Sequence, residues 1–257
     1  MDRGRPDLGV KAAACASVDR AEDEPALAQT VNGQAPAVLA ETATRCGCWL
    51  VHYSTDYVFD GSGHRPWREG DPRGPLGVYG RTKLAGEQAV AMHARHLILR
   101  TSWVYSLTGA CFLRTILRAA QQRDRLEVVD DQVGAPTGAD LIADVTAQLL
   151  RELRGREQDE VAGTYHLAPR GAVSWCGYAR HVITRARSAG IPLRVADDAV
   201  HPVPSSAWPT RAVRPLNSRL DVERIEATFG LRMPDWQHGV DDVIDALARL
   251  QEAAAGA

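Results

Sequence analysis

Short apolar runs and segments of helical periodicity alternate along the first half of the chain. The apolar runs have the length and composition of buried strands. They lie at residues 10–16, 49–53, 96–100 and 126–129. Segments with the apolar spacing of helices lie at residues 24–45, 79–94 and 111–121. Gly33 and Pro36 interrupt the first helical segment. Because strands and helices alternate, the pattern predicts an α/β fold with a doubly wound parallel sheet.

The alternation loosens beyond about residue 130. Three further segments of helical periodicity follow, at residues 140–153, 174–188 and 236–254. Between the last two, prolines punctuate a loop-rich stretch, at Pro192, Pro202, Pro204, Pro209 and Pro215. Loop-rich stretches of this kind are typical of a binding lobe. We therefore predict an α/β domain at residues 1–130 and a smaller lobe at residues 131–257.

Composition and charge exclude several functional classes. The net charge of the 257 residues is -2, so no basic field points to nucleic acid or to an anionic membrane. No apolar run is long enough to span a bilayer, and the first eight residues lack the apolar core of a secretory signal. Five cysteines in no disulfide framework predict reduced thiols and a cytoplasmic protein. Cys46 and Cys48 have no second pair at metal-finger spacing, so we expect no metal site.

Tyr79 and Lys83 are the first candidates for chemistry. Four residues apart on a predicted helix, they share one face. A nearby ammonium favours the phenolate and lowers the pKa of a tyrosine. Such a pair can exchange a proton while a carbonyl is reduced or an alcohol oxidised. The same spacing also fits a surface pair, but Lys83 is one of only two lysines in the chain, with Lys11.

A hydroxyl at the end of a predicted strand adds to this pattern. Thr55 and Asp56 follow the strand at residues 49–53, and ligands of open α/β sheets bind at the carboxyl ends of strands. A hydroxyl there can stabilise negative charge that develops on a substrate oxygen. Thr55 could instead simply end the strand, with Asp56 as a turn cap. We expect His52, inside the strand, to be a hydrogen-bonded core histidine.

Several motifs together resemble one family. Residues 53–61 read YSTDYVFDG and residues 79–87 read YGRTKLAGE. Residues 100–105, 131–137 and 214–220 read RTSWVY, DQVGAPT and RPLNSRL. In this order the motifs resemble the extended short-chain dehydrogenase/reductase family, over about residues 6–250. The resemblance implies a Rossmann-like fold and an oxidoreductase of dTDP-rhamnose biosynthesis. That activity reduces the 4-keto group of dTDP-4-dehydro-L-rhamnose with NADPH, or alternatively NADH.

The resemblance also implies residue roles. Tyr79 would give a proton to the C4 oxygen, and Lys83 would hold the nicotinamide ribose. Thr55 would bond the sugar carbonyl. The dTDP-sugar would also contact Asp56 and Trp103. The cofactor would further contact Ala13 and Ala14. Lys11 departs from the family pattern, which usually has an asparagine at this position near the cofactor.

The resemblance further implies an N-terminally incomplete cofactor domain. Members of the family open with a strand, a Gly-rich turn and a helix whose N-terminus takes the cofactor pyrophosphate. Residues 1–16 resemble instead the lead into the family's fourth strand. We therefore expect residues 1–130 to form a partial NAD(P)-binding domain that binds NADPH weakly, and residues 131–257 mainly a substrate-binding lobe.

The sequence leaves open the exact function, the oligomeric state and the role of three arginines. A non-catalytic relative that binds a nucleotide sugar or regulates a partner protein is the main alternative. A reductase or epimerase of another nucleotide sugar is a second one. The oligomeric state is also open, with a homodimer among the alternatives. Arg211, Arg214 and Arg219 could hold the substrate diphosphate or lie on the surface.

Overall fold

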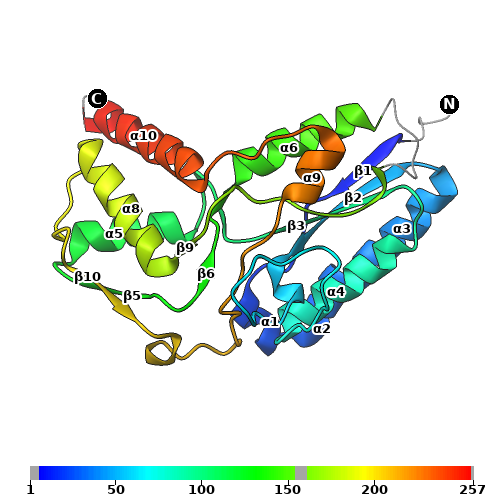
Figure 1. Ribbon diagram of the computed structural model, residues 1–257, viewed down its shortest axis with the longest axis horizontal. Coiled ribbons are helices and arrows are strands. Elements are labelled where there is room, and N and C mark those ends of the chain that lie inside the picture. The colour runs from blue at the N-terminus through cyan, green and yellow to red at the C-terminus, as the bar shows by residue number, and fades with distance from the viewer. Residues whose placement is uncertain (1–5, 154–160, 256–257) are drawn as a thin grey trace. The chain divides into compact units, whose positions relative to one another are not determined.

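The computed structural model describes residues 6–153 and 161–255, in two compact units that interleave along the chain (Figure 1). Unit 1 comprises Met1–Thr101, Thr146–Leu167 and Thr210–Arg232. Unit 2 comprises Ser102–Val145, Ala168–Pro209 and Met233–Ala257. The chain therefore passes repeatedly from one unit to the other, and each unit is built from segments distant in sequence.

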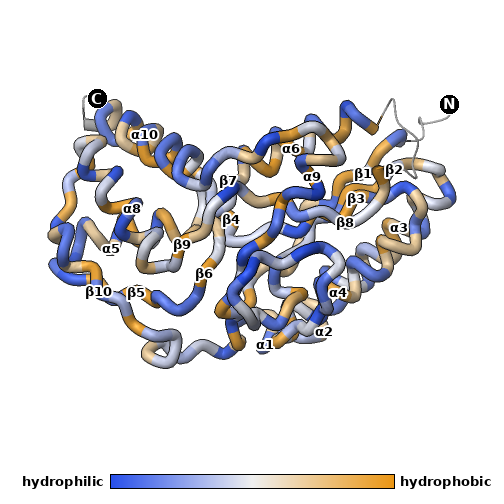
Figure 2. The backbone as a smooth tube through the Cα atoms, viewed as in Figure 1, coloured by the Kyte–Doolittle hydropathy of each residue, from blue (hydrophilic) through white to orange (hydrophobic). Residues whose placement is uncertain are grey.

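Unit 1 is built on a parallel sheet with the strand order β1-β2-β3-β8. The strands are β1 (Leu8–Lys11), β2 (Trp49–Thr55), β3 (His96–Thr101) and β8 (Gly163–His166). Each of β1 to β3 contains a short run with Leu, Val or Ile and ends on polar residues (Figure 2). In this register Lys11 lies opposite His52, and Thr55 lies opposite Thr101.

Helices cover both faces of this sheet. On one face lie α1 (Val18–Asp23), α2 (Pro25–Gln29), a π-helical turn η1 (Thr30–Gln34), α3 (Ala35–Cys46) and α4 (Val78–Ala91). On the other lie α9 (Glu223–Phe229) and the end of α6 (Ala139–Glu152) (Figure 1). The predicted interruption near Gly33 is confirmed, because Gly33 lies in the π-helical turn.

A buried ion pair joins α4 to the sheet. The Arg100 guanidinium on β3 donates to both carboxylate oxygens of Glu87 on α4, at 2.9 and 2.7 Å. Arg100 is fully buried and Glu87 nearly so. A third donor of Arg100 reaches the Glu69 carbonyl oxygen at 3.2 Å, and the guanidinium lies over the Phe59 ring. The pair and this third hydrogen bond fix β3 against α4 and against the loop that precedes α4.

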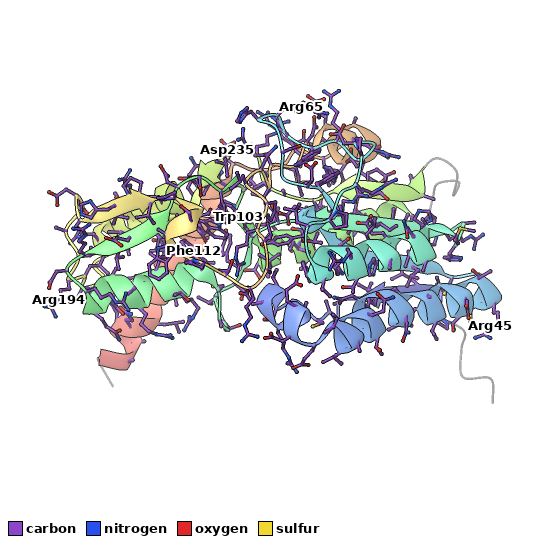
Figure 3. All side chains as sticks on the ribbon, turned by 90° about the horizontal axis from the view of Figure 1, so that it is seen from below. Arg45, Arg65, Trp103, Phe112, Arg194 and Asp235 are labelled. Carbon is purple, nitrogen blue, oxygen red and sulfur yellow. The ribbon has the colours of Figure 1, made fainter. Side chains whose placement is uncertain are left out.

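In unit 2 the second of three helices packs against a two-stranded parallel sheet, and the other two helices pack on that helix. The helices are α5 (Phe112–Gln122), α8 (Trp175–Ser188) and α10 (Trp236–Ala255), and the strands are β5 (Leu126–Val129) and β10 (Val200–Val203). Figure 3 shows Trp103 and Phe112 in this unit. Trp103 stacks on Trp175 with ring centroids 3.5 Å apart, and Phe112 also packs on Trp175. These aromatic rings border the unit's apolar core.

The two units also contain several elements of only two or three residues. Two-residue strands pair β4 (Val104–Tyr105) with β7 (Thr137–Gly138) and β6 (Val133–Gly134) with β9 (Val173–Ser174). Single 3-10 turns are η2 (Asp56–Val58) and η3 (Ser205–Ala207). Ser174 caps α8 by accepting a hydrogen bond from the Gly177 N–H at 3.0 Å.

The α/β class and the parallel sheet are confirmed, but several predicted boundaries differ. The strand predicted at residues 10–16 ends at Lys11, and the one predicted at 49–53 continues to Thr55. The units do not divide at residue 130. Strand β8 returns to unit 1 to pair with β3, and Trp67 pairs with Leu220. Pairings between residues so distant in sequence leave no local signal.

The buried ion pair yields a stability prediction. Replacing Glu87 with Gln leaves the guanidinium of Arg100 buried without its counter-charge. We expect the free energy of unfolding to fall by about 3–5 kcal/mol, measured by urea denaturation. Glu127→Gln is the control, because it removes an exposed pair with Arg125 and should cost under about 1 kcal/mol. Equal losses in the two variants would contradict the role given to the buried pair.

Candidate active site

The hydroxyl of Thr55 is the centre of a hydrogen-bond chain in unit 1. It accepts a hydrogen bond from the Tyr57 N–H at 3.2 Å and donates to Asp56 Oδ1 at 3.0 Å. It is also hydrogen-bonded to the side chain of Tyr79. The predicted strand-end hydroxyl and the predicted tyrosine therefore meet directly.

Tyr79 lies in the first turn of α4, edge-on to Tyr57 with ring centroids 5.4 Å apart. Burial raises the pKa of the Tyr79 phenol well above its ordinary value, and the charge of Asp56 raises it further. The hydrogen bond with Thr55 opposes this effect. The expected lowering of this pKa by Lys83 is therefore wrong for the protein alone. Desolvation dominates, and Tyr79 stays in its proton-donating form.

Lys83 lies one helical turn after Tyr79 and is only 3% exposed. Its ammonium donates to the Tyr53 carbonyl oxygen on β2 at 2.5 Å. Burial lowers the pKa of Lys83 to about 7, the charge of Lys11 lowers it further, and Glu87 raises it. An ammonium carries three donors, and only the one to Tyr53 has a partner among the described residues. Lys83 can therefore hold further acceptors.

Asp56 ends the hydrogen-bond chain. It is 2% exposed, and burial raises its pKa to about 6 against the opposing hydrogen bonds from Ser218 and Thr55. Its Oδ2 has no hydrogen-bond partner among the described residues. Ser218 and Tyr57 were not singled out from the sequence, although both lie in motifs that carried the resemblance. Only folding shows that they surround Tyr79 and Asp56.

Two glycines of α4 allow the helix to approach its neighbours. A Cβ at Gly80 would lie 2.2 Å from the Tyr57 carbonyl oxygen, and one at Gly86 would lie 2.2 Å from the Asn32 carbonyl oxygen. Real Cβ atoms do not come so close to backbone. The glycines therefore let α4 contact η2 and η1, which brings Tyr79 within reach of Thr55. Gly80 is therefore needed for the contact between α4 and η2.

Ala13 and Ala14 lie just beyond the carboxyl end of β1, not on it, and both are exposed. Asn32 fixes the segment that follows. Its side chain bonds both backbone groups of Cys15 and the Thr82 hydroxyl on α4. Ala13 and Ala14 are small and exposed, and the next residue, Cys15, is joined through Asn32 to α4. Side chains this small leave room for a flat ligand at the end of β1.

Trp103 belongs to unit 2. Its backbone has a φ of 49°, in the left-handed region that non-glycine residues seldom adopt. The stacked Trp175 ring supports it in this conformation. Strained residues of this kind cluster at functional sites, which agrees with the expected substrate contact of Trp103.

His52 and the arginine cluster differ from the simplest expectations. His52 is fully buried, but neither ring nitrogen has a hydrogen-bond partner among the described residues. The expectation of a hydrogen-bonded core histidine is therefore wrong. Arg211 and Arg214 pair with Asp23 and Asp19 of α1. Their charges are thus already compensated in the absence of an anionic ligand.

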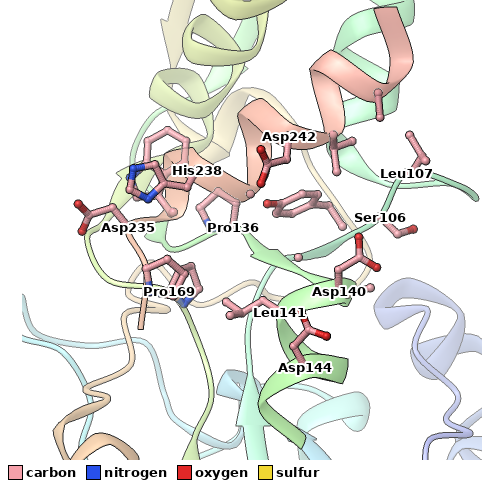
Figure 4. Close-up of a pocket in the computed structure, with 18 residues that line it drawn as sticks. Ser106, Leu107, Pro136, Asp140, Leu141, Asp144, Pro169, Asp235, His238 and Asp242 are labelled. Carbon is pink, nitrogen blue, oxygen red and sulfur yellow. The ribbon is translucent and has the colours of Figure 1, made fainter. Parts of the chain in front are cut away.

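A pocket of about 310 Å³ lies in unit 2, between the start of α6 and the start of α10 (Figure 4). Asp140, Asp144 and Asp242 stand around it, and Tyr105 lines it. None of the site residues predicted from the sequence belongs to its lining. The candidate active site is therefore defined by the hydrogen-bond chain of unit 1 rather than by this cavity.

Three further findings concern the described residues only. They contain no cluster of three or more His, Cys, Asp or Glu side chains arranged to hold a metal ion. All five cysteines are free, as the sequence predicts. No described helix combines the length and the apolar character needed to cross a membrane.

The parallel sheet, the strand-end hydroxyl and the Tyr-x-x-x-Lys helix define a Rossmann-like reductase of the short-chain dehydrogenase type. The family model described as the RmlD substrate binding domain matches residues 1–249. The chain is 49% identical over 244 residues to the dTDP-4-dehydrorhamnose reductase of Escherichia coli K12, covering 95% of this chain and 80% of the relative. The chain belongs to the dTDP-4-dehydrorhamnose reductase family.

Solved structures agree with this assignment. A dTDP-4-dehydrorhamnose reductase from Clostridium acetobutylicum aligns with a TM-score of 0.85 at 32% identity, over 94% of this chain and 81% of the other. One from Bacillus anthracis, in complex with NADP, aligns with a TM-score of 0.82 at 32% identity, over 93% and 80%. Both likenesses extend through the two units of the chain.

The close approach of α4 to η2 can be tested. Gly80→Ala should force the helix away from the Tyr57 carbonyl, and we expect it to lower the free energy of unfolding by about 1–3 kcal/mol. Gly70→Ala is the matched control, because a Cβ at Gly70 meets nothing within 4 Å. Urea denaturation of both variants checks this. The contact is not tight if Gly80→Ala is as stable as Gly70→Ala.

Proposed function

We propose that this chain reduces the 4-keto group of dTDP-4-dehydro-L-rhamnose to dTDP-L-rhamnose with NADPH. The observation that carries the proposal is the convergence of Thr55, Tyr79 and Lys83 at the carboxyl end of β2. Family membership supplies the substrate class and the cofactor. The same site therefore has a carbonyl-binding hydroxyl, a proton donor and a cation.

In this proposal Tyr79 gives its proton to the C4 oxygen of the sugar. Reduction needs a protonated phenol, and the raised pKa of Tyr79 keeps the phenol protonated at neutral pH. Tyr79 is already hydrogen-bonded to Thr55 in the protein alone. A substrate carbonyl oxygen placed between the two hydroxyls would take the same hydrogen bond. Tyr79 is thus oriented before substrate binds.

The residues present fit a nicotinamide cofactor. Lys83 has unused donors beside Tyr53, and an ammonium there can bond ribose hydroxyls. Ala13 and Ala14 offer small exposed side chains at the end of β1. When bound by Lys83 and beside Ala13 and Ala14, a reduced nicotinamide would supply the hydride for this reduction. A charged Lys83 beside Tyr79 would then stabilise the phenolate left after proton transfer.

Asp56 and Trp103 complete the proposed substrate site. Asp56 accepts the hydrogen bond of Thr55 in the protein alone, and Thr55 would turn this donor to the sugar carbonyl when substrate binds. Asp56 Oδ2 would remain able to accept a donor from the sugar. Trp103 offers a large apolar surface of the kind that packs on sugar rings. The free cysteines agree with a reducing compartment, so we place the reaction in the cytoplasm.

Oxidation of NADPH by the purified chain, followed spectrophotometrically with the keto sugar, tests the assignment. A reductase consumes NADPH only when dTDP-4-dehydro-L-rhamnose is present, and faster than with other keto nucleotide sugars. Binding of the dTDP-sugar without NADPH oxidation would point to the non-catalytic alternative. Preference for a different nucleotide sugar would change the substrate but not the class of reaction.

Removal of the phenol tests the proton donor. We expect Tyr79→Phe to lower turnover by about 10²–10⁴-fold, the usual worth of a general acid. Tyr53→Phe is the matched control: it removes only a hydroxyl bonded to Thr146 and keeps the backbone carbonyl that binds Lys83. Circular dichroism should show both variants folded. Near-normal turnover by Tyr79→Phe would refute the role of Tyr79.

The lowered pKa of Lys83 predicts a pH dependence of cofactor affinity. Lys83 is charged below its pKa of about 7 and neutral above it. The Kd for NADP⁺, measured by calorimetry, should therefore rise as the pH increases from 7 to 9, by at most about tenfold per pH unit. Lys83→Gln has no ionisable group there and should show a flatter profile. Identical slopes in both proteins would exclude Lys83 as the cause.

A further inference from the structure

The two lysines of this chain are both buried, and both lie close enough to one histidine to lower its pKa. Lys11 is 8% exposed at the end of β1, and Lys83 is 3% exposed on α4. His52 lies directly opposite Lys11 in the sheet register, and the next residue of β2, Tyr53, accepts the hydrogen bond of Lys83. Two cations therefore face one wholly buried imidazole.

Within the described part of the chain, no counter-charge is bound to Lys11. Its ammonium donates to the Val31 carbonyl oxygen of η1 at 3.1 Å, and no ion pair with another described residue involves it. His52 cannot separate the two charges by hydrogen bonding, because both its ring nitrogens lack partners among the described residues. Burial lowers the pKa of His52 to about 2, followed by Lys83 and Lys11, so the imidazole stays neutral. The repulsion between the lysines is thus not compensated locally.

The other charged groups around Lys83 come from α4, β3 and η2. Glu87 is one helical turn away, but Arg100 of β3 binds both its oxygens. Asp56 of η2 bonds Thr55 and Ser218. Tyr79 is protonated, as is Tyr57, whose pKa burial raises to about 12. From α1, Glu22 accepts the Val78 N–H at the start of α4. Among the described residues, Lys11 is therefore a cation near Lys83 that has no carboxylate partner.

Lys83 is the more deeply buried of the two lysines, at 3% against 8% exposed. Burial lowers the pKa of both, and the charge of Lys11 lowers the pKa of Lys83 further.

We propose that Lys11 is a positioning residue that acts through Lys83: its buried ammonium, on the strand that pairs with the one to which Lys83 bonds, favours the neutral form of Lys83 and lowers the upper pH limit of the reductase. Lys11 does not transfer a proton in this role. The effect on turnover rests on the proposed reductase function, whereas the effect on the charge of Lys83 does not.

The presence of only two lysines allows a direct test. In full-length protein labelled with ¹³C-lysine, the Cε signals titrate individually in NMR spectra, and Lys11→Gln leaves the signal of Lys83 alone. We expect the titration midpoint of Lys83 to rise by at least about 0.5 pH units in Lys11→Gln. Lys11→Met is a second neutral variant in case the first does not fold. Lys11→Arg keeps the charge and should keep the midpoint low.

Controls separate this effect from a general change of charge. Arg81 is exposed on α4, two residues before Lys83, so Arg81→Gln should leave the midpoint unchanged because solvent screens its charge. An unchanged midpoint in Lys11→Gln and Lys11→Met would overturn the proposal, as would an equal rise in Arg81→Gln.

Turnover provides the second readout. The falling limb of kcat/KM against pH should move upward in Lys11→Gln by the same interval as the NMR midpoint, with little change in kcat at low pH. A shifted midpoint with an unshifted limb would overturn the link to the reductase. If no variant and no wild-type protein reduces the keto sugar, the proposed function fails, while the NMR comparison still decides whether Lys11 controls Lys83.

Discussion

The buried ion pair between Arg100 and Glu87 is the interaction on which the candidate active site depends. A guanidinium without access to water must be paired, so the helix that carries Glu87 cannot rotate or slide without losing its partner. Tyr79, Lys83 and Glu87 are spaced four residues apart and form one stripe of α4. Holding Glu87 against β3 therefore also holds the tyrosine and the lysine over β2. Gly80 and Gly86 permit the close contact that this arrangement requires.

Desolvation, rather than pairing of the tyrosine with the lysine, sets the protonation states in the protein alone. It favours the neutral form of each group, so it keeps Tyr79 protonated and makes Lys83 easy to deprotonate. For a reductase the first effect is useful, because the phenol must begin the reaction with its proton. The second effect makes the charge of Lys83 sensitive to everything that enters the site, including a bound anion.

The local features of this site can be predicted from the sequence, whereas its contacts between distant segments cannot. The spacing of Tyr79 and Lys83, and Thr55 at a strand end, are local patterns, and the structure brings the two hydroxyls together. Ser218 reaches Asp56 from a segment more than 150 residues away, so no period or spacing could predict it. Likewise Lys11 meets His52 only through the register of β1 and β2. The direction of the Tyr79 pKa could not be foreseen either, because it depends on burial.

The interleaving of the two units has a consequence for how the chain is made. Unit 1 needs β8 and residues 210–232 to complete it, and unit 2 needs α10. During synthesis, neither unit has all its parts until most of the chain has left the ribosome. The usual order, in which an N-terminal domain folds while the next is translated, is closed to this protein. Until then the nascent strands of the sheet keep their apolar faces exposed, and the growing chain is prone to aggregate.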